Sequence, residues 1–419
     1  DPFLMPDMQP AVDRLLKAID ENERVVLYGD YDVDGVTSVA LIQEVLGKYG
    51  LECQGFLPHR MDEGYGVSKS GVERCLKDHD PQLIIAVDCG TTSIEEVAYL
   101  KEHAVDVVIC DHHECSQDGR PDCVALVNPK VGDEYHYLCS AGVVFKVAHA
   151  LLKTRPNPAL DLKDYLDIVA LGTVADIVPL VSENRILVRK GLHRLRKTDN
   201  CGLVALKRET KLGERIQTSD IGFRLGPRLN AAGRLHTAQS ALDLLLERDP
   251  AEAKSIAQKL DQQNRERQEL EYRMYDEALA MIEKGPHPRD RCSIVLGSDD
   301  WHPGVVGIVA SRLMRRYHRP TFVVAFDETG LGKGSGRSVE KISLVSALNS
   351  CDDLLIKGGG HEMAAGLSIW KQNFPDFQQR FEEIVAANAR SEYLIPTLYV
   401  DAEVQLTELT LSLLDSYEM

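Results

Sequence analysis

The chain has 419 residues, 44% of them hydrophobic and 27% charged, which is typical of a globular protein with two or three domains. No apolar run reaches 18 residues and no signal peptide is evident, so the sequence predicts neither a membrane span nor secretion. The net charge of −17, taken alone, argues against nucleic-acid binding. The chain opens at Asp1 rather than at Met, which we interpret as trimming of something that preceded it.

Ten cysteines are scattered along the chain, and no Cys-X-X-Cys pair occurs. Several lie in apolar or strand-like settings, such as Cys89, Cys110 and Cys139. These features favour reduced thiols in the cytoplasm over a disulfide framework or a zinc knuckle.

Positive charge is concentrated in two segments of the chain. Residues 184–236 contain thirteen Lys and Arg against four Asp and Glu, and residues 301–341 contain seven against three. The rest of the chain is therefore strongly acidic. Two basic segments in an acidic body fit a groove that holds a polyanion, and solvated helix faces are the alternative interpretation.

The first 190 residues alternate short apolar strands with helical stretches. Strands are predicted over 24–29, 83–87 and 105–110, and helices over 36–49 and 93–103. This pattern predicts a parallel α/β sheet, which binds ligands beyond the carboxyl ends of its strands.

Residues 237–284 have a helical pattern throughout, with Pro250 at a helix start. The polar stretch from 251 to 282 suits a connector between domains. A second α/β unit follows, with strands predicted over 292–296 and 321–326. Residues 397–404 resemble the first strand of a further domain.

Three alternating carboxylates follow the first predicted strand. Residues 29–35 read Gly-Asp-Tyr-Asp-Val-Asp-Gly, so Asp30, Asp32 and Asp34 converge only if a divalent cation offsets their repulsion. A calcium-binding loop needs a Glu about twelve residues along, where this chain has Leu41. The motif therefore favours another kind of metal site.

Further acidic and histidine motifs follow later apolar stretches. They are Asp88, the run Asp111-His112-His113, and Asp176. Each alone is weak evidence, because an Asp after a strand is most often a helix cap. All four motifs, however, fall at predicted strand ends, where a parallel sheet binds ligands. Oxygen ligands with one or two imidazoles suit two Mn²⁺ or Mg²⁺ ions rather than zinc.

The four motifs, DYDVDG, VDCG, DHH and GTVAD, resemble those of the DHH phosphoesterase superfamily. Four further segments resemble the single-strand-specific exonuclease branch of this superfamily: residues 226–234, 301–308, 334–338 and 358–361. The resemblance covers nearly the whole chain. The resemblance implies an α/β fold in which a parallel-sheet DHH domain is joined by a long helix to a smaller α/β domain.

The implied domain boundaries cover the whole chain. They are a DHH catalytic domain with a basic insert over 1–236, a connector helix over 237–285, a nucleic-acid-binding DHH-associated C-terminal domain over 286–393, and the truncated start of a β-rich oligonucleotide-binding domain over 394–419.

The resemblance also implies roles for the metal-site residues. Asp32 and Asp34 correspond to a metal-bridging pair, and the further ligands are Asp88, His112 and Asp176. Many superfamily members carry a His where this chain has Tyr28, so Asp30 is expected to substitute as a ligand. The expected catalytic residues are His113, near the scissile phosphate, and Asp111, which would orient one of the two histidines.

Substrate binding is expected from both basic segments. Arg224 lies in the first basic segment, beside the family-like stretch 226–234. The expected substrate-binding residues are Arg60, Arg228, Arg234, Ser335, Arg337, Ser338 and His361.

The expected function is a 5′-to-3′ exonuclease that hydrolyses single-stranded DNA to 5′-mononucleotides with two metal ions, in DNA repair and recombination. The alternative is a DHH-type nano-RNase or cyclic-dinucleotide phosphodiesterase that acts on very short substrates. A catalytically dead binding module is disfavoured because all the acidic motif positions are present. Single-stranded DNA, a single-strand-binding protein and a RecQ-type helicase are the expected partners of a cytoplasmic monomer.

Overall fold

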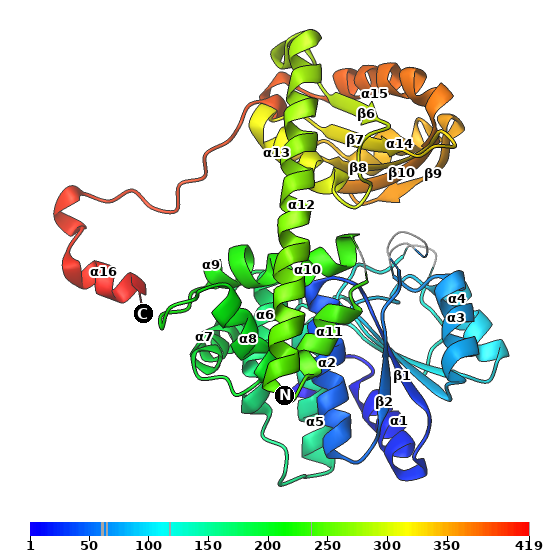
Figure 1. Ribbon diagram of the computed structural model, residues 1–419, viewed down its shortest axis with the longest axis vertical. Coiled ribbons are helices and arrows are strands. Elements are labelled where there is room, and N and C mark those ends of the chain that lie inside the picture. Colours follow the sequence, from blue (N-terminus) through cyan, green and yellow to red (C-terminus); the bar gives the residue numbers. More distant parts are fainter. Residues whose placement is uncertain (60–62, 64–65, 117–118, 236, 419) are drawn as a thin grey trace. The chain divides into compact units, whose positions relative to one another are not determined.

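The structure is a computed structural model that describes residues 1–59, 63, 66–116, 119–235 and 237–418. It consists of two compact units, residues 1–269 and 270–419 (Figure 1). Helix α12 (Pro250–Lys284) begins in the first unit and ends in the second. None of the helices in the described ranges is both long and apolar enough to cross a membrane.

The first unit is built on a five-stranded parallel sheet with the order β2-β1-β3-β4-β5. The three predicted strands are the neighbours β1, β3 and β4, so the prediction of a parallel sheet is confirmed. The strands are β1 (Val25–Gly29), β2 (Cys53–Phe56), β3 (Leu83–Val87), β4 (Asp106–Cys110) and β5 (Ala125–Val127).

Both faces of this sheet are covered by helices, which explains why strands such as β1 and β3 are apolar and buried along their whole length. Successive side chains of a strand point to opposite faces. Val25 and Leu27 of β1 belong to the core formed with α1 (Met8–Glu21), α2 (Val33–Lys48) and α5 (Ser140–Thr154). Val26 and Tyr28 belong to the core formed with α3 (Lys69–His79) and α4 (Ile94–Glu102) on the other face (Figure 1).

A helical layer follows the sheet in the chain. Its members are α6 (Leu166–Ala175), α7 (Ser182–Arg196), α8 (Cys201–Glu209), α9 (Thr218–Asp220), a π-helical turn (Ile221–Leu225), α10 (Gly226–Leu235) and α11 (Gln239–Leu246). The helical pattern predicted for residues 237–284 is thus two helices, and the second starts at Pro250 as expected.

The second unit contains a five-stranded mixed sheet with the order β6-β7-β8-β10-β9, in which only β6 and β7 are parallel. Its strands are β6 (Ile294–Ser298), β7 (Thr321–Phe326), β8 (Leu331–Arg337), β9 (Leu355–Gly360) and β10 (Ala364–Trp370). Its helices are α13 (Val306–Tyr317), α14 (Leu344–Asn349), α15 (Phe374–Asn388) and α16 (Leu411–Glu418).

Two local predictions differ from the structure. Helix α2 starts at Val33, three residues before the predicted start, because the carboxylate of Asp32 caps it by accepting from the backbone N–H groups of Asp34 and Gly35. Residues 397–404 form no strand. They are exposed and have no neighbouring strand to bond with, so an extended sequence pattern alone does not make a strand there.

Candidate metal centre

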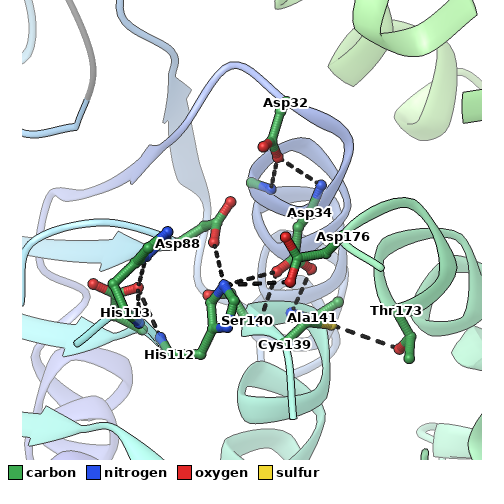
Figure 2. Close-up of polar contacts among 12 residues, drawn as sticks. Asp32, Asp34, Asp88, His112, His113, Cys139, Ser140, Ala141, Thr173 and Asp176 are labelled. Carbon is green, nitrogen blue, oxygen red and sulfur yellow. Dashed lines mark hydrogen bonds and ion pairs between the residues drawn. The ribbon is translucent and has the colours of Figure 1, made fainter. Parts of the chain in front are cut away.

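The predicted acidic and histidine motifs meet at one edge of the parallel sheet (Figure 2). Asp30 follows β1, Asp88 follows β3 and Asp111 follows β4, and these three strands are neighbours. Asp176 reaches the same place from the end of helix α6, not from a strand end as expected. Periodicity cannot separate a short buried helix from a buried strand, and residues 166–175 are such an apolar helix.

Asp34 is fixed between two helices. It lies in the first turn of α2, and its carboxylate accepts from the backbone N–H groups of Ser140 (2.7 Å) and Ala141 (2.9 Å) at the start of α5. The partial positive charge of a helix N-terminus stabilises a carboxylate in this position. Gly172 of α6 makes the approach possible, because a Cβ there would lie 2.7 Å from Oδ1 of Asp34.

His112 lies at the centre of the cluster. Its Nε2 atom is 3.5 Å from a carboxylate oxygen of Asp88, 3.5 Å from one of Asp176 and 3.9 Å from one of Asp34. Figure 2 shows the imidazole between Asp88 on one side and Asp34 and Asp176 on the other. This is the arrangement expected of ligands that surround a cation.

The electrostatics of the cluster also call for a cation. Burial, and then the charge of Asp32, raise the pKa of Asp34 to about 6. Burial, and then the charge of Asp34, raise the pKa of Asp176 to about 8, and burial with the same neighbouring charges raises the pKa of Asp88 well above its usual value. Burial lowers the pKa of His112 to about 4, so its imidazole is neutral and able to bind a metal.

The donor set fits hard divalent cations. Oδ1 of Asp88 and Nε2 of His112 are buried, and neither has a hydrogen-bond partner within the described part of the chain. Unpaired buried polar atoms are costly unless something binds them. Carboxylate oxygens with imidazole suit Mn²⁺ or Mg²⁺.

The ligand atoms fall into three overlapping groups, each within 4.8 Å: Asp88-His112-His113, Asp34-His112-Asp176 and Asp30-Asp32-Asp88. Two ions would account for the second and third of these groups. Asp88 belongs to two of the groups, whereas none found among the described residues contains both Asp32 and Asp34. The groups do not decide which carboxylate would bridge the two ions, so the bridging role expected of Asp32 and Asp34 stays a prediction.

His113 is held by Asp111. Its Nδ1 atom lies 2.7 Å from Oδ1 of Asp111, which also accepts from the backbone N–H of His112. Burial lowers the pKa of His113, but the hydrogen bond and charge of Asp111 outweigh that effect and raise the pKa to about 9. The structure thus gives Asp111 the orienting position that was expected of it.

The buried side-chain amide of Asn128, whose role the sequence did not reveal, supports His113. The side chain of Asn128 donates to the carbonyl of His113 (2.9 Å) and to the hydroxyl of Thr91 (2.9 Å). The backbone N–H of Thr91 in turn donates to Asp111. An Asn after a short strand gives no sequence signal for this role, because its partners lie in the loops that follow other strands.

Tyr28 belongs to the buried core on the face of the sheet that α3 and α4 cover. Its side chain is fully buried, its hydroxyl lies 3.4 Å from the carbonyl of Gly66, and burial raises its pKa far above the usual value. Asp30, by contrast, lies within 4.8 Å of Asp32 and Asp88 in one of the ligand groups. The structure therefore places Asp30 where the expected substitute ligand should be.

The family-like stretch 226–234 packs against the first metal motif, residues 29–35. The side chain of Asn230 accepts from the backbone N–H of Val33 (3.1 Å). A Cβ at Gly233 would lie 2.6 Å from the carbonyl oxygen of Tyr31, so only glycine allows this contact. The sequence interpretation assigned this stretch to DNA binding and missed its supporting role.

Two arginines of the first basic segment are engaged within the protein. Arg228 pairs with the buried carboxylate of Asp261 (2.8 Å), and Arg224 pairs with Asp220 and donates to the carbonyl of Lys211. Arg228 is thus held in place by an ion pair, and its expected phosphate contact stays a prediction. Arg234 is half-buried at the end of α10. Arg60 lies outside the described residues.

In the second unit, Ser335 and Arg337 lie at the end of β8, and a guanidinium nitrogen of Arg337 is 3.0 Å from the Ser335 hydroxyl. Gly307, in the first turn of α13, lies against both, since a Cβ there would be 3.0 Å from Oγ of Ser335 and 3.3 Å from Nη2 of Arg337. An arginine, a hydroxyl and a helix N-terminus together suit an anion.

The other two residues expected to bind phosphate in this unit, Ser338 and His361, lie in different environments. Ser338 is buried, and its hydroxyl donates to the carbonyl of Ile342 (2.6 Å), so it shapes the turn and does not face a ligand. His361 is exposed in the β9–β10 hairpin. That hairpin lies next to the end of β8, because Ala364 pairs with Arg337.

The fold and this cluster define a DHH phosphoesterase, and comparison with known families agrees. Residues 24–173 match the DHH family, N-terminal domain, and residues 291–387 match the DHHA1 domain. The chain belongs to the RecJ family of single-stranded-DNA-specific exonucleases. It is 36% identical to that exonuclease of Haemophilus influenzae over 98% of this chain and 74% of the relative.

Other relatives agree with this assignment. The chain is 41% identical to the Bacillus subtilis RecJ over 98% of its length, but spans only about half (52%) of that relative. It superposes on a crystal structure of exonuclease RecJ bound to manganese with a TM-score of 0.80 and 36% identity, covering 91% of this chain and 95% of that one. The Thermus thermophilus RecJ structure in complex with Mg²⁺ matches with a TM-score of 0.73 and 32% identity, over 91% of this chain and 53% of that one.

Proposed function

We propose that this chain is a metal-dependent exonuclease that hydrolyses single-stranded DNA from its 5′ end to 5′-mononucleotides, in DNA repair and recombination. The observation that carries the proposal is the convergence of five aspartates and His112 into overlapping ligand groups at one sheet edge. The family relationship supplies the substrate class, since the relatives are single-stranded-DNA-specific exonucleases.

Two Mn²⁺ or Mg²⁺ ions fit the cluster, one held by Asp34, His112 and Asp176 and the other by Asp30, Asp32 and Asp88. Such a pair activates a water and stabilises the leaving oxygen in phosphodiester hydrolysis. The chain's own contribution is orientation. Asp111 holds the imidazole of His113 beside the ligands, and we infer that this imidazole donates a hydrogen bond to the phosphate.

The direct test is digestion of a long 5′-phosphorylated single strand in Mn²⁺ and in EDTA, with products sized on a gel. We expect mononucleotides in Mn²⁺, and no digestion in EDTA or with Asp34→Asn. The alternative activity, on very short or cyclic substrates, predicts the reverse preference: rapid cleavage of di- and trinucleotides and an intact long strand.

Recognition of the 5′ end is proposed to involve Arg337. Arg337→Ala should weaken binding of 5′-phosphorylated strands more than 5′-hydroxyl strands, by about 1–3 kcal/mol, because a charge-assisted hydrogen bond is lost. Fluorescence anisotropy with both strands measures the difference.

Ser338→Ala is the matched control for Arg337→Ala, since its buried hydroxyl serves the turn alone. It should lower stability and leave the preference for phosphate unchanged. An equal loss on both kinds of strand in Arg337→Ala would instead make Arg337 a general backbone contact.

Location and partners are inferred from the family relationship. We infer a cytoplasmic monomer that acts with a single-strand-binding protein and a RecQ-type helicase. The ten cysteines, all free thiols in the structure, are compatible with a reducing compartment. Light scattering at working concentration tests the monomer, and pull-down with each purified partner tests the complexes.

A further inference from the structure

The loop directly after Asp176 exposes an apolar surface. Residues 177–181 read Ile-Val-Pro-Leu-Val, and we call them the 177–181 loop. The side chain of Ile177 is 87% exposed, that of Leu180 38% and that of Val181 51%. Single exposed apolar side chains are ordinary, but several in one loop indicate a contact surface.

Ile177 also has an unfavourable backbone conformation. Its φ angle is +62°, in the left-handed region that glycine adopts freely and β-branched residues avoid. The exposed side chain gains nothing from burial that would offset this strain. Strained residues of this kind cluster at functional sites, where the side chain has a task.

The loop is held firmly. The buried side chain of Asn184 donates to the carbonyl of Pro179 (3.0 Å) and to that of Tyr137. The backbone N–H of Ile177 lies 3.3 Å from the carbonyl of Val174 in α6. The start and the middle of the loop are therefore fixed, and its apolar side chains are presented to solvent by the fold itself.

The position of Ile177 links it to the metal centre. It is bonded to Asp176, so their Cα atoms are about 3.8 Å apart. A carboxylate oxygen of Asp176 lies 3.5 Å from Nε2 of His112. A phosphodiester bound at this cluster carries a sugar and a base on each side, and every base offers an apolar face whatever its sequence.

We propose that Ile177, with Leu180 and Val181, contacts the nucleobase next to the scissile phosphate and so determines how the terminal nucleotide is bound. This inference rests on the proposed exonuclease function and adds a substrate-contacting surface to it. Aliphatic contact with a base face is indifferent to base identity, as digestion of a strand of any sequence requires. The contact holds the nucleotide and leaves the metal ligands unchanged.

Ile177→Gly tests the proposal, because glycine removes the side chain and relieves the strain together. With 5′-phosphorylated single strands, KM should rise about tenfold, as for loss of a partly buried aliphatic contact, with kcat nearly unchanged. With strands that lack the two 5′-terminal bases, KM should rise less than twofold. Mn²⁺ binding by calorimetry should be unchanged, and the unfolding midpoint should increase by about 2 °C.

Ala104→Gly is the matched control. Ala104 is exposed and has a φ of +56°, but it precedes β4 at the opposite end of that strand from the metal motif. This variant should leave KM unchanged on both kinds of strand. A merely structural role for Ile177 cannot increase stability while it weakens base-dependent binding.

These measurements distinguish failure of the proposed Ile177 contact from failure of the proposed exonuclease function. Unchanged KM in Ile177→Gly, or an equal rise with and without terminal bases, would overturn the contact while leaving the exonuclease assignment intact. If the parent protein digests no single-stranded DNA in Mn²⁺, the proposed function fails and the contact fails with it. Binding of the same strands in EDTA, measured by anisotropy, provides a readout that is independent of turnover.

Discussion

Replacing Asp176 should have opposite effects on stability in the absence and in the presence of bound metal. Without a cation, its half-buried carboxylate lies close to that of Asp34, and both partial burial and this repulsion raise its pKa to about 8. Asp176→Asn should therefore increase the unfolding midpoint in EDTA. The same variant should lose most of the stabilisation that Mn²⁺ gives the parent, because one ligand is missing.

Thermal unfolding of the parent and of Asp176→Asn, with EDTA and with excess Mn²⁺, measures both effects. Asp133→Asn, which removes an exposed carboxylate in the same unit, should change neither midpoint. Destabilisation of Asp176→Asn in EDTA would mean that Asp176 is a structural residue first.

Asp167 should make stability depend on pH. Its carboxyl is buried, which raises its pKa, although Thr198 donates to it (2.6 Å) and the charge of Arg194 opposes the shift. The folded protein then binds a proton more tightly than the unfolded chain, whose Asp pKa is about 3.9. Stability is therefore lost as pH rises from about 4 through the raised pKa of the folded state.

Asp167→Asn removes this loss and keeps an acceptor for Thr198. The free energy of unfolding of the variant, relative to the parent, should increase with pH across that window and then level off. Denaturant titrations from pH 4 to pH 8 measure the trend. A constant difference between variant and parent would show that burial of Asp167 carries no ionisation cost.

Three helices meet at the metal centre, and a single glycine sets their spacing. A Cβ on Gly172 of α6 would lie 2.6 Å from Oγ1 of Thr37 in α2 and 2.7 Å from Cβ of Ala141 in α5. Gly172→Ala should cost about 1–3 kcal/mol of stability through overpacking, and it should weaken Mn²⁺ binding because Asp34 is displaced.

Chemical denaturation and calorimetry measure the two losses in Gly172→Ala. Gly213→Ala adds the same methyl group where no atom lies within 4 Å, and it should be nearly neutral in both assays. Overpacking that destabilised the protein without affecting Mn²⁺ would separate helix packing from the position of Asp34.

At the scale of elements, the sequence predicted what depends on local pattern. Strands β1, β3 and β4 and the long helix α12 have strong hydrophobic or polar periodicity, and their positions were close to those observed. Helix α6 was missed because a buried helix is apolar on every side, so it carries no periodic signal. Asp176 was nevertheless assigned correctly to the cluster, because its motif, not its element, identified it.

Two other site predictions depended on hydrogen-bond partners that the sequence does not reveal. Arg228 looked like a phosphate contact, yet it pairs with Asp261, 33 residues away. Ser338 looked like part of an anion pocket, yet its hydroxyl bonds within its own turn. The Asp261 partner cannot be read from the sequence, because it is determined by how separate segments pack. The Ile342 partner is only four residues from Ser338, but it is a backbone carbonyl, which residue types do not reveal.

For the whole molecule, the uneven charge distribution predicts salt-dependent DNA binding despite the net charge of −17. Arg189 is exposed on α7 within the first basic segment. Arg189→Gln should flatten the slope of log K against log salt by about 0.7, the value for one phosphate contact on a single strand.

Arg228→Ala, in the same segment, should behave differently. It should cost about 2–3 kcal/mol of stability by removing a partner of the buried Asp261, with little change in the salt slope. Anisotropy at several salt concentrations, together with denaturation, distinguishes the two variants. A flat slope in the parent protein would mean that the basic segment faces only solvent.

The contact between Asn230 and the first metal motif also determines when the metal centre can be completed during protein synthesis. The amide of Asn230 accepts from Val33, across 197 positions of the chain. A ribosome that adds about 5–20 residues per second needs some 10–40 s to cover that interval. During synthesis, the DYDVDG motif therefore emerges long before Asn230, which contacts it. A nascent chain carries these carboxylates before the metal centre is complete. The proposed nuclease centre is thus incomplete until most of the first unit has been made.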